Sequence, residues 1–554
     1  MGGRVSAYLP LSQHAYLPGR STGEFLWSLQ YLRSIAERFG ERAHILKLDL
    51  EKAFDSLDRQ LLLNILRDNK LCDEDELRMI QFLLSDTTLR ARVDGKLGST
   101  FSTLIGTPQG DGLSPILFII YLAHILYLAD PFLRDLVLES DLALTYADDH
   151  LVALRETANQ IAERATCEAL LAAEFDRGER ADTTHLPTCN CVLCQAHKIP
   201  IILSEHLATY RMKLDPGKTL HREITSKSTD LDKTMGCVFE YKALMKSRRA
   251  NADVAFYSMN SLWLKGAPVS DPRKLTIYNA ICLPHFTHTG GAIALRQVDL
   301  DLLDSRHRVQ LRKLLCCFYP DSISNQDLYL RADTRPISIM LLAARWRLLG
   351  HIERRSPDLP AHQTMLQLLA QSEDGPALRA TWKGGKRTFL HKMLCQDLQH
   401  LPEEVRLRYF GVTKFTTEND LLSLREHAQD RAQWRHAVFI LSEAAFVNWQ
   451  KRDSMIAARQ RLAQERVAER AASGTAPRRR KITRDSTASK QAYRRARSKA
   501  KTYAAGQTRG GGKGPRKLKP SKPKPPRSTD AQVIAARLAV PPKGIRKFFS
   551  PNPK

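Results

Sequence analysis

Three acidic residues occupy positions where backbone geometry would display their side chains. Asp49 lies at the end of an alternating apolar segment, residues 44–50, and Asp148 and Asp149 lie between two apolar runs within residues 142–154. This patterning predicts a strand for the first segment and a hairpin for the second, with the paired aspartates in its turn. A strand end beside a hairpin turn can gather three carboxylates, and two Mg²⁺ ions that relieve their repulsion suit in-line phosphoryl transfer. The alternative is that Asp148 and Asp149 serve only the turn.

These aspartates belong to longer motifs that occur in order along the chain. Residues 49–55 read Asp-Leu-Glu-Lys-Ala-Phe-Asp, residues 106–115 read Gly-Thr-Pro-Gln-Gly-Asp-Gly-Leu-Ser-Pro, and residues 146–149 read Tyr-Ala-Asp-Asp. The set resembles palm motifs A, B and C of reverse transcriptases, most closely the non-LTR retrotransposon type, with group II intron maturases as nearest relatives. Other segments similar to this family are found at 13–22, 214–219, 235–238 and 348–352.

The resemblance implies an RNA-directed DNA polymerase that extends a primer 3′-OH on an RNA template with two Mg²⁺ or Mn²⁺ ions. It implies that Asp49 and Asp148 each ligate both metal ions and that Asp149 is the more peripheral carboxylate. The Leu50 carbonyl would complete the oxygen shell. Lys218, in the segment that resembles motif D, would donate a proton to the leaving pyrophosphate.

Four further residues are implied to contact nucleotide or template. Phe54 stands where the family places a steric gate against a ribose 2′-OH, and the alternative is a core phenylalanine. Gln109 and Gly110 lie on a loop whose glycines let backbone approach a substrate closely. Arg20 is a candidate contact to phosphate or template.

The fold class expected is α+β, a right-hand polymerase palm with partial fingers, since only a dozen residues precede the segment at 13–22. Two other functions stay open: an RNA-binding descendant with impaired catalysis, and a maturase-like splicing cofactor. The expected regions are fingers and palm (1–225), an irregular Cys/His-rich insertion within them (about 176–200), a helical thumb (226–330), a helical C-terminal region (331–473) and a disordered basic tail (474–554).

The expected insertion concentrates soft metal ligands. His185, Cys189, Cys191, Cys194 and His197 fall within thirteen residues, and a tetrahedral Zn²⁺ needs four of them. Cys191 and Cys194 have the usual two-residue spacing of a zinc site. Cys189, Cys194 and His197, with either Cys191 or His185, could complete one Zn²⁺ site. The alternative is an exposed loop with accidental cysteines.

The charge of the chain is concentrated at its end. Residues 451–554 contain 30 of the 85 basic residues and 5 of the 59 acidic ones, which leaves 55 basic and 54 acidic residues before them. A flexible basic arm neutralises phosphates without reading sequence, which favours a nucleic-acid partner. Its basic clusters also resemble nuclear localisation signals, so we expect the protein to be synthesised in the cytoplasm and to function in the nucleus. Near the terminus, Ile545, Phe548 and Phe549 resemble the hydrophobic plug of peptides that bind a DNA sliding clamp.

Composition excludes some other classes. Ten cysteines in 554 residues do not make a disulfide scaffold, which favours a reducing compartment. The longest apolar stretch, residues 115–129, is shorter than the ~20 residues of a membrane span, so no membrane partner is expected.

Overall fold

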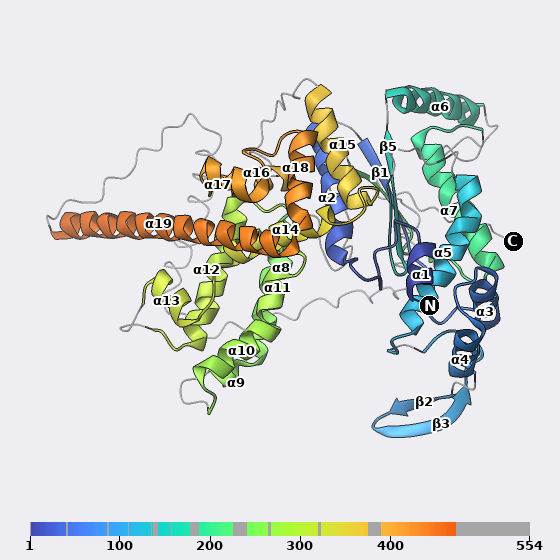
Figure 1. The fold of residues 1–554 in the computed structure, drawn as a ribbon, viewed down its shortest axis with the longest axis horizontal. Coiled ribbons are helices and arrows are strands. Elements are labelled where there is room, and N and C mark those ends of the chain that lie inside the picture. The colour runs from blue at the N-terminus through green and yellow to red at the C-terminus, as the bar shows by residue number, and fades with distance from the viewer. Residues whose placement is uncertain are drawn as a thin grey trace, which may run out of the picture. The chain divides into compact units, whose positions relative to one another are not determined.

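The computed structural model of the chain describes residues 2–39, 42–85, 88–108, 110–133, 136, 142–156, 158–177, 188–224, 241–263, 268–318, 323–374 and 389–472 (Figure 1). Gln109, His185, the segment at 235–238 and the tail with Ile545, Phe548 and Phe549 lie outside these residues. Met1–Gln450 belong to one compact unit and Lys451–Pro541 to a second. The regions expected as palm, thumb and most of the helical C-terminal region thus fall in the first unit.

A four-stranded antiparallel sheet carries the predicted catalytic motifs. It consists of β4 (Leu142–Tyr146), β5 (Asp149–Glu156), β1 (Arg42–Leu48) and β6 (Leu220–Ile224), in that spatial order. The strand and the hairpin predicted from alternation are confirmed as β1 and as the β4–β5 pair. The order puts β1 and β5 side by side in the middle of the sheet, so each is hydrogen-bonded to a neighbouring strand along both of its edges.

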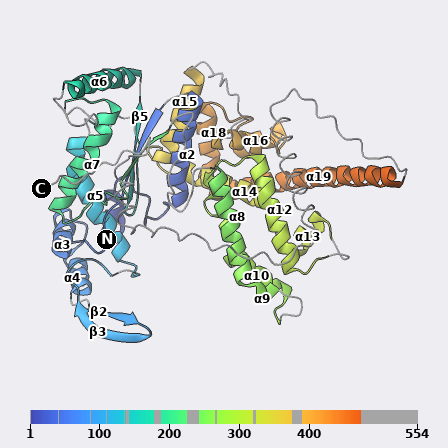
Figure 2. The same ribbon diagram turned by 180° about the vertical axis from the view of Figure 1, so that it is seen from behind.

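The two faces of the sheet belong to different hydrophobic cores. Ile45 and Leu151 point into a core with α2 (Thr22–Phe39) and α15 (Pro360–Asp374), whereas Leu46, Val152 and Leu154 point into a core with α5 (Ser114–Leu133) and α7 (Val192–Thr209). Neighbouring residues of a strand face opposite ways, so this division follows from the sequence pattern. Figures 1 and 2 show α2 and α15 on one side of β1 and β5, and α5 and α7 on the other.

Short elements precede and follow motif A. They are α1 (Gly2–Tyr8), α3 (Arg59–Asp68), α4 (Glu74–Leu84), and the hairpin of β2 (Thr88–Val93) with β3 (Lys96–Ser102). The turn residues of this hairpin, Asp94 and Gly95, both have positive φ. Asp58 caps α3 through bonds from the N–H groups of Gln60 and Leu61, which ends the motif A loop at a fixed point.

Helix α5 extends beyond the apolar stretch 115–129, which by itself is too short for a membrane span. It spans 20 residues, and by length and composition alone it could cross a membrane. Half of the residues in its most apolar part are buried inside the protein. Its contacts with α3 and α7 make it the central helix of the second core.

The prediction of an irregular insertion at about 176–200 is wrong for residues 192–200, which are helical. Helix α6 (Ala158–Asp176) precedes it, and α7 already begins at Val192, with Ile199 and Leu203 buried against the sheet. Cysteine packs as a small apolar residue, so a Cys-rich segment can begin a core helix as readily as a loop.

Helices form the rest of the described chain. These are α8 (Tyr241–Ser258), α9 (Asn260–Trp263), α10 (Asp271–Ile281), α11 (Leu283–Thr287), the 3₁₀ helix η1 (Gly290–Ala292), α12 (Gln297–Leu314), α13 (Asn325–Arg331), α14 (Ile337–Glu353), α15, α16 (Leu390–Leu398), α17 (Glu403–Phe410), α18 (Glu418–Gln429) and α19 (Arg431–Ala472).

The segment at 348–352 lies on α14 and joins distant parts of the first unit. His351 Nε2 is 2.8 Å from the carbonyl of Gly19 and 3.0 Å from a carboxylate oxygen of Glu24 at the start of α2. Gly350 faces Trp434 of α19 so closely that a Cβ there would lie 2.0 Å from the indole nitrogen. That nitrogen donates to the Trp346 carbonyl at 2.9 Å. The glycine therefore permits the contact between α14 and α19.

We predict that Gly350→Ala destabilises the fold by about 1–3 kcal/mol, because the new methyl group displaces a buried indole from its place. Chemical denaturation followed by fluorescence measures the change. Gly3→Ala is the matched control, because a Cβ at Gly3 in α1 meets nothing within 4 Å. Equal stability of the two variants would contradict this role of Gly350.

Candidate active site

The pairing of β1 with β5 brings motifs A and C together. Leu48 pairs with His150, so Asp49, the next residue of the chain, lies beside the turn between β4 and β5. Tyr146 pairs with Asp149 and closes this turn around Ala147 and Asp148. Ala147 adopts φ +56°, the left-handed conformation that the two-residue turn requires. The sequence prediction of neighbouring carboxylates therefore agrees with the strand register.

The three aspartates influence one another electrostatically. Burial raises the pKa of Asp148, and the charges of Asp149 and Asp49 raise it further. Asp149 lies 3.1 Å from Lys47 Nζ, and Asp49 lies 3.4 Å from Lys218 Nζ. Hard oxygen donors with surplus negative charge fit divalent cations such as Mg²⁺.

The side chains of Asp49, Asp148 and Asp149 do not lie close enough together to share one metal ion. Among the described residues, the one group of three or more side chains close enough to share a metal ion consists of cysteines. Asp49 and Asp149 each have a lysine partner instead.

Lys218 reaches Asp49 because the loop that carries it is bonded to the end of β1. The N–H of Asp215 donates to the Asp49 carbonyl at 2.8 Å, and the N–H of Glu51 donates to the Lys213 carbonyl at 2.8 Å. Leu50 and Leu214 lie opposite each other between these two hydrogen bonds, as an antiparallel pair. Neither bond uses the Leu50 carbonyl. Asp49 raises the pKa of Lys218, and Asp215, 3.4 Å from Lys218, adds to this effect.

Gln13 begins the family-like segment at 13–22, and its side chain supports the turn between β4 and β5 directly. Its buried side-chain oxygen accepts from the N–H of Ala147 at 3.3 Å and from the N–H of Ala15 at 2.9 Å. Residues around it pair in parallel with β4, where the His14 N–H donates to the Thr145 carbonyl at 2.8 Å. Tyr16 follows, and Asp148 is one of the groups that raise its pKa, after burial and Tyr146.

The motif B loop lies against motif A. The N–H of Gly106 donates to the Leu57 carbonyl at 2.7 Å, and the N–H of Thr107 donates to the Phe54 carbonyl at 3.0 Å. A Cβ on Gly106, at φ +77°, would lie 3.0 Å from the backbone of Asp55, so this close approach requires glycine. Gly110 has φ +98° and open space around it.

Phe54 packs against the core, as the alternative of a core phenylalanine expects, and nothing in the structure tests its expected role as a steric gate. Its ring is half-buried and stacks on Phe118 of α5, with centroids 4.5 Å apart and planes inclined by 28°. The contact fixes the ring at the edge of the core and leaves part of it exposed.

Arg20 is half-buried at the contact with α14. Burial lowers its pKa, Glu24 opposes this, and Arg355 adds to it. The carbonyl of Gly19, its neighbour, accepts from Arg355 Nε at 3.1 Å. The structure therefore places Arg20 beside the helical region.

The cysteine prediction needs one correction. The Sγ atoms of Cys189, Cys191 and Cys194 gather with that of Cys167 from α6, and His197 is not in this group. Cys167 lies 22 residues ahead of Cys189, so the local spacing could not reveal it.

Comparison with known proteins supports the palm assignment. Residues 5–177 match the family model described as "Reverse transcriptase (RNA-dependent DNA polymerase)". The chain therefore carries a reverse transcriptase domain. No curated protein matches the chain.

Two solved structures are similar to part of the chain. Telomerase from Candida albicans, in complex with a TWJ fragment of telomeric RNA, is 13% identical, with a TM-score of 0.32 over 67% of this chain and 55% of that one. Telomerase from Candida tropicalis is 13% identical, with a TM-score of 0.28 over 64% and 53%. The chain spans about half the length of each of these proteins.

We predict that Gln13→Ala loosens the turn between β4 and β5, because it leaves two buried N–H groups without their acceptor. The cost is about 1–3 kcal/mol of unfolding free energy. Hydrogen exchange should show faster exchange over residues 142–150. Gln81→Ala, on the exposed side of α4, is the control. Unchanged exchange at the turn in Gln13→Ala would show that this residue does not support it.

Proposed function

We propose that the chain is an RNA-directed DNA polymerase of a eukaryotic non-LTR retrotransposon, which copies RNA by adding deoxynucleotides to a primer 3′-OH. The observation that carries this proposal is the strand register that places Asp49 of motif A beside the turn with Asp148 and Asp149 of motif C, with Lys218 3.4 Å from Asp49. The match of residues 5–177 to the reverse transcriptase family supports it independently.

Asp49, Asp148 and Asp149 would hold Mg²⁺ or Mn²⁺, with the Leu50 carbonyl as a further oxygen donor. When bound, such ions supply Lewis-acid stabilisation of the charge that develops during phosphoryl transfer. Lys218 is a charged ammonium at neutral pH, so it would carry the proton that the leaving pyrophosphate needs.

Substrate choice would depend on the motif A and motif B loops. Phe54, held by Phe118, would exclude a ribose 2′-OH, and Gln109 and Gly110 would contact the incoming nucleotide. Arg20 would act on template or phosphate from the contact with α14.

The proposed partners are an RNA template and a DNA or RNA primer. The tail carries 30 basic against 5 acidic residues, so it would supply much of the salt-dependent attraction to them. From sequence alone we also propose a nuclear location, and that Ile545, Phe548 and Phe549 bind a sliding clamp.

The test is primer extension on an RNA template with Mg²⁺ or Mn²⁺. Asp148→Asn should reduce extension by about 100-fold or more, which corresponds to a loss of ~3 kcal/mol of transition-state stabilisation. RNA binding should persist in this variant. Asp94→Asn is the control, because it makes the same change in the hairpin turn between β2 and β3.

Undiminished extension by Asp148→Asn would refute the site assignment. Binding of RNA without extension by the wild-type chain would favour the RNA-binding descendant, and stimulation of intron splicing would favour the maturase-like cofactor.

A further inference from the structure

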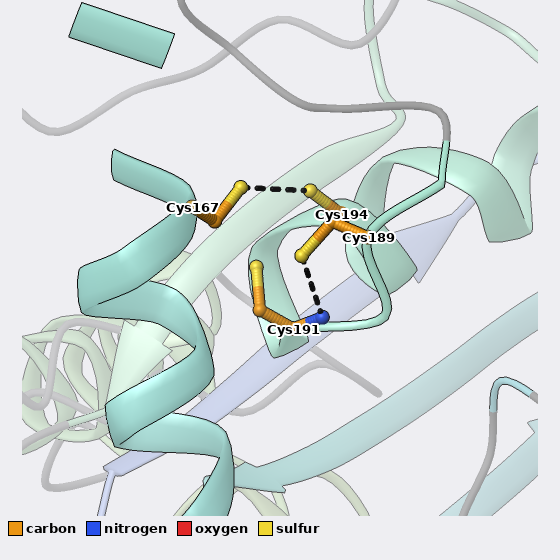
Figure 3. A group of neighbouring side chains, drawn as sticks. All are labelled: Cys167, Cys189, Cys191 and Cys194. Carbon is orange, nitrogen blue, oxygen red and sulfur yellow. Dashed lines mark hydrogen bonds between the residues drawn. The ribbon is translucent and has the colours of Figure 1, made fainter. Parts of the chain in front are cut away.

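Four cysteine thiols meet at the contact between α6 and α7 (Figure 3). Cys167 comes from α6, Cys189 and Cys191 from the segment before α7, and Cys194 from the first turn of α7. Their Sγ atoms all lie within 4.8 Å of one another, and those of Cys167 and Cys194 are 3.6 Å apart. Cys189 is half-buried and the other three are buried.

The spacing of the sulfur atoms fits a single metal ion. A Zn–S bond of about 2.3 Å in a tetrahedral site separates neighbouring sulfurs by about 3.8 Å. The four thiols need only small side-chain rotations to reach this arrangement. Cys191 and Cys194 also have the two-residue spacing common in zinc sites.

Polar groups around the cluster suit thiolates. The N–H of Cys191 donates to Cys189 Sγ at 3.3 Å. Lys198 Nζ donates to the Cys189 carbonyl at 2.8 Å and to Asn190 Oδ1 at 3.1 Å. This places a positive charge beside a site that would carry net negative charge with a metal bound. Such outer contacts orient metal ligands and stabilise them.

Apart from the cysteines, the described residues of α6 make few contacts with the rest of the protein. One of these contacts is an ion pair, in which Arg164 Nε lies 2.9 Å from the Glu156 carboxylate of β5. Of its described side chains, Gln160, Cys167 and Leu171 are buried, and its apolar cluster with α7 consists largely of the cysteines themselves. Gln160 Nε2 also donates to Gln195 Oε1 of α7, at 3.3 Å. This is a small contact for a 19-residue helix, because the apolar area it removes from water is small.

We propose that Cys167, Cys189, Cys191 and Cys194 bind one structural Zn²⁺ that joins α6 to the start of α7. A buried set of four sulfurs selects zinc or iron chemistry, and four protein ligands leave no open position for catalysis. The ion fixes α6, which follows strand β5 of the catalytic hairpin, and the N-terminus of α7, which leads to the loop that carries Lys218.

Elemental analysis of the full-length protein, purified without chelator, tests the site. We expect about one zinc per chain, and Cys167→Ser should lose it. Cys72→Ser, at a half-buried cysteine between α3 and α4, should keep it. His197→Ala should also keep it, which separates the four-cysteine site from one completed by histidine.

A second measurement covers the case in which Cys167→Ser folds poorly. Hydrogen exchange on the wild-type chain should show α6 protected, unprotected after a zinc chelator, and protected again after Zn²⁺ is added. Exchange in the sheet should change little. Co²⁺ in place of zinc should show the charge-transfer absorption of a four-thiolate tetrahedral site.

Four results would each overturn the proposal: no zinc in the wild-type chain, iron with labile sulfide in its place, a Cys167–Cys194 disulfide in freshly purified protein, or zinc retained by Cys167→Ser but lost from His197→Ala. Since none of these measurements uses polymerase activity, failure of the proposed function would leave them unaffected.

Discussion

The register of β1 against β5 is the constraint on which the site depends. Leu48 opposite His150 brings Asp49 to the turn that holds Asp148. Side chains alternate between the faces of a sheet, so a slip by one residue would exchange Ile45 and Leu46 between the two cores. The same slip would separate the motif A carboxylate from motif C. Burial of both faces therefore fixes the geometry of the acidic site.

The surrounding elements convert this register into a defined site. Gln13 accepts a hydrogen bond from the turn between β4 and β5. The Asp49 carbonyl accepts one from Asp215, which holds the loop of Lys218 against the end of β1. Gly106 lets the motif B loop lie against the motif A loop. On the far side of the sheet, α2 packs against α15, and His351 contacts Gly19 just ahead of α2. The helices after residue 330 thereby share a core with the strands that carry the aspartates.

Sequence reasoning located most of this framework because its signals are local. Alternation marks β1 and the β4–β5 hairpin, and motif spacing marks Asp49, Asp148, Asp149 and Lys218. Gln13 was not predicted as a support, because its importance depends on a parallel contact with Thr145 more than a hundred residues away. The cysteine site was predicted with His197 in place of Cys167, because only the folding of α6 against α7 brings Cys167 close.

The most direct test of this account is Mn²⁺ binding followed by electron paramagnetic resonance on the full chain with primer, template and nucleotide. Mn²⁺ prefers oxygen ligands, so it should report the aspartates rather than the cysteines. We predict that Asp49→Asn weakens Mn²⁺ binding by at least about tenfold, which corresponds to ~1.4 kcal/mol. Asp94→Asn should bind Mn²⁺ as the wild-type chain does. Equal Mn²⁺ binding by Asp49→Asn and the wild-type chain would contradict the claim that the β1–β5 register builds a metal site.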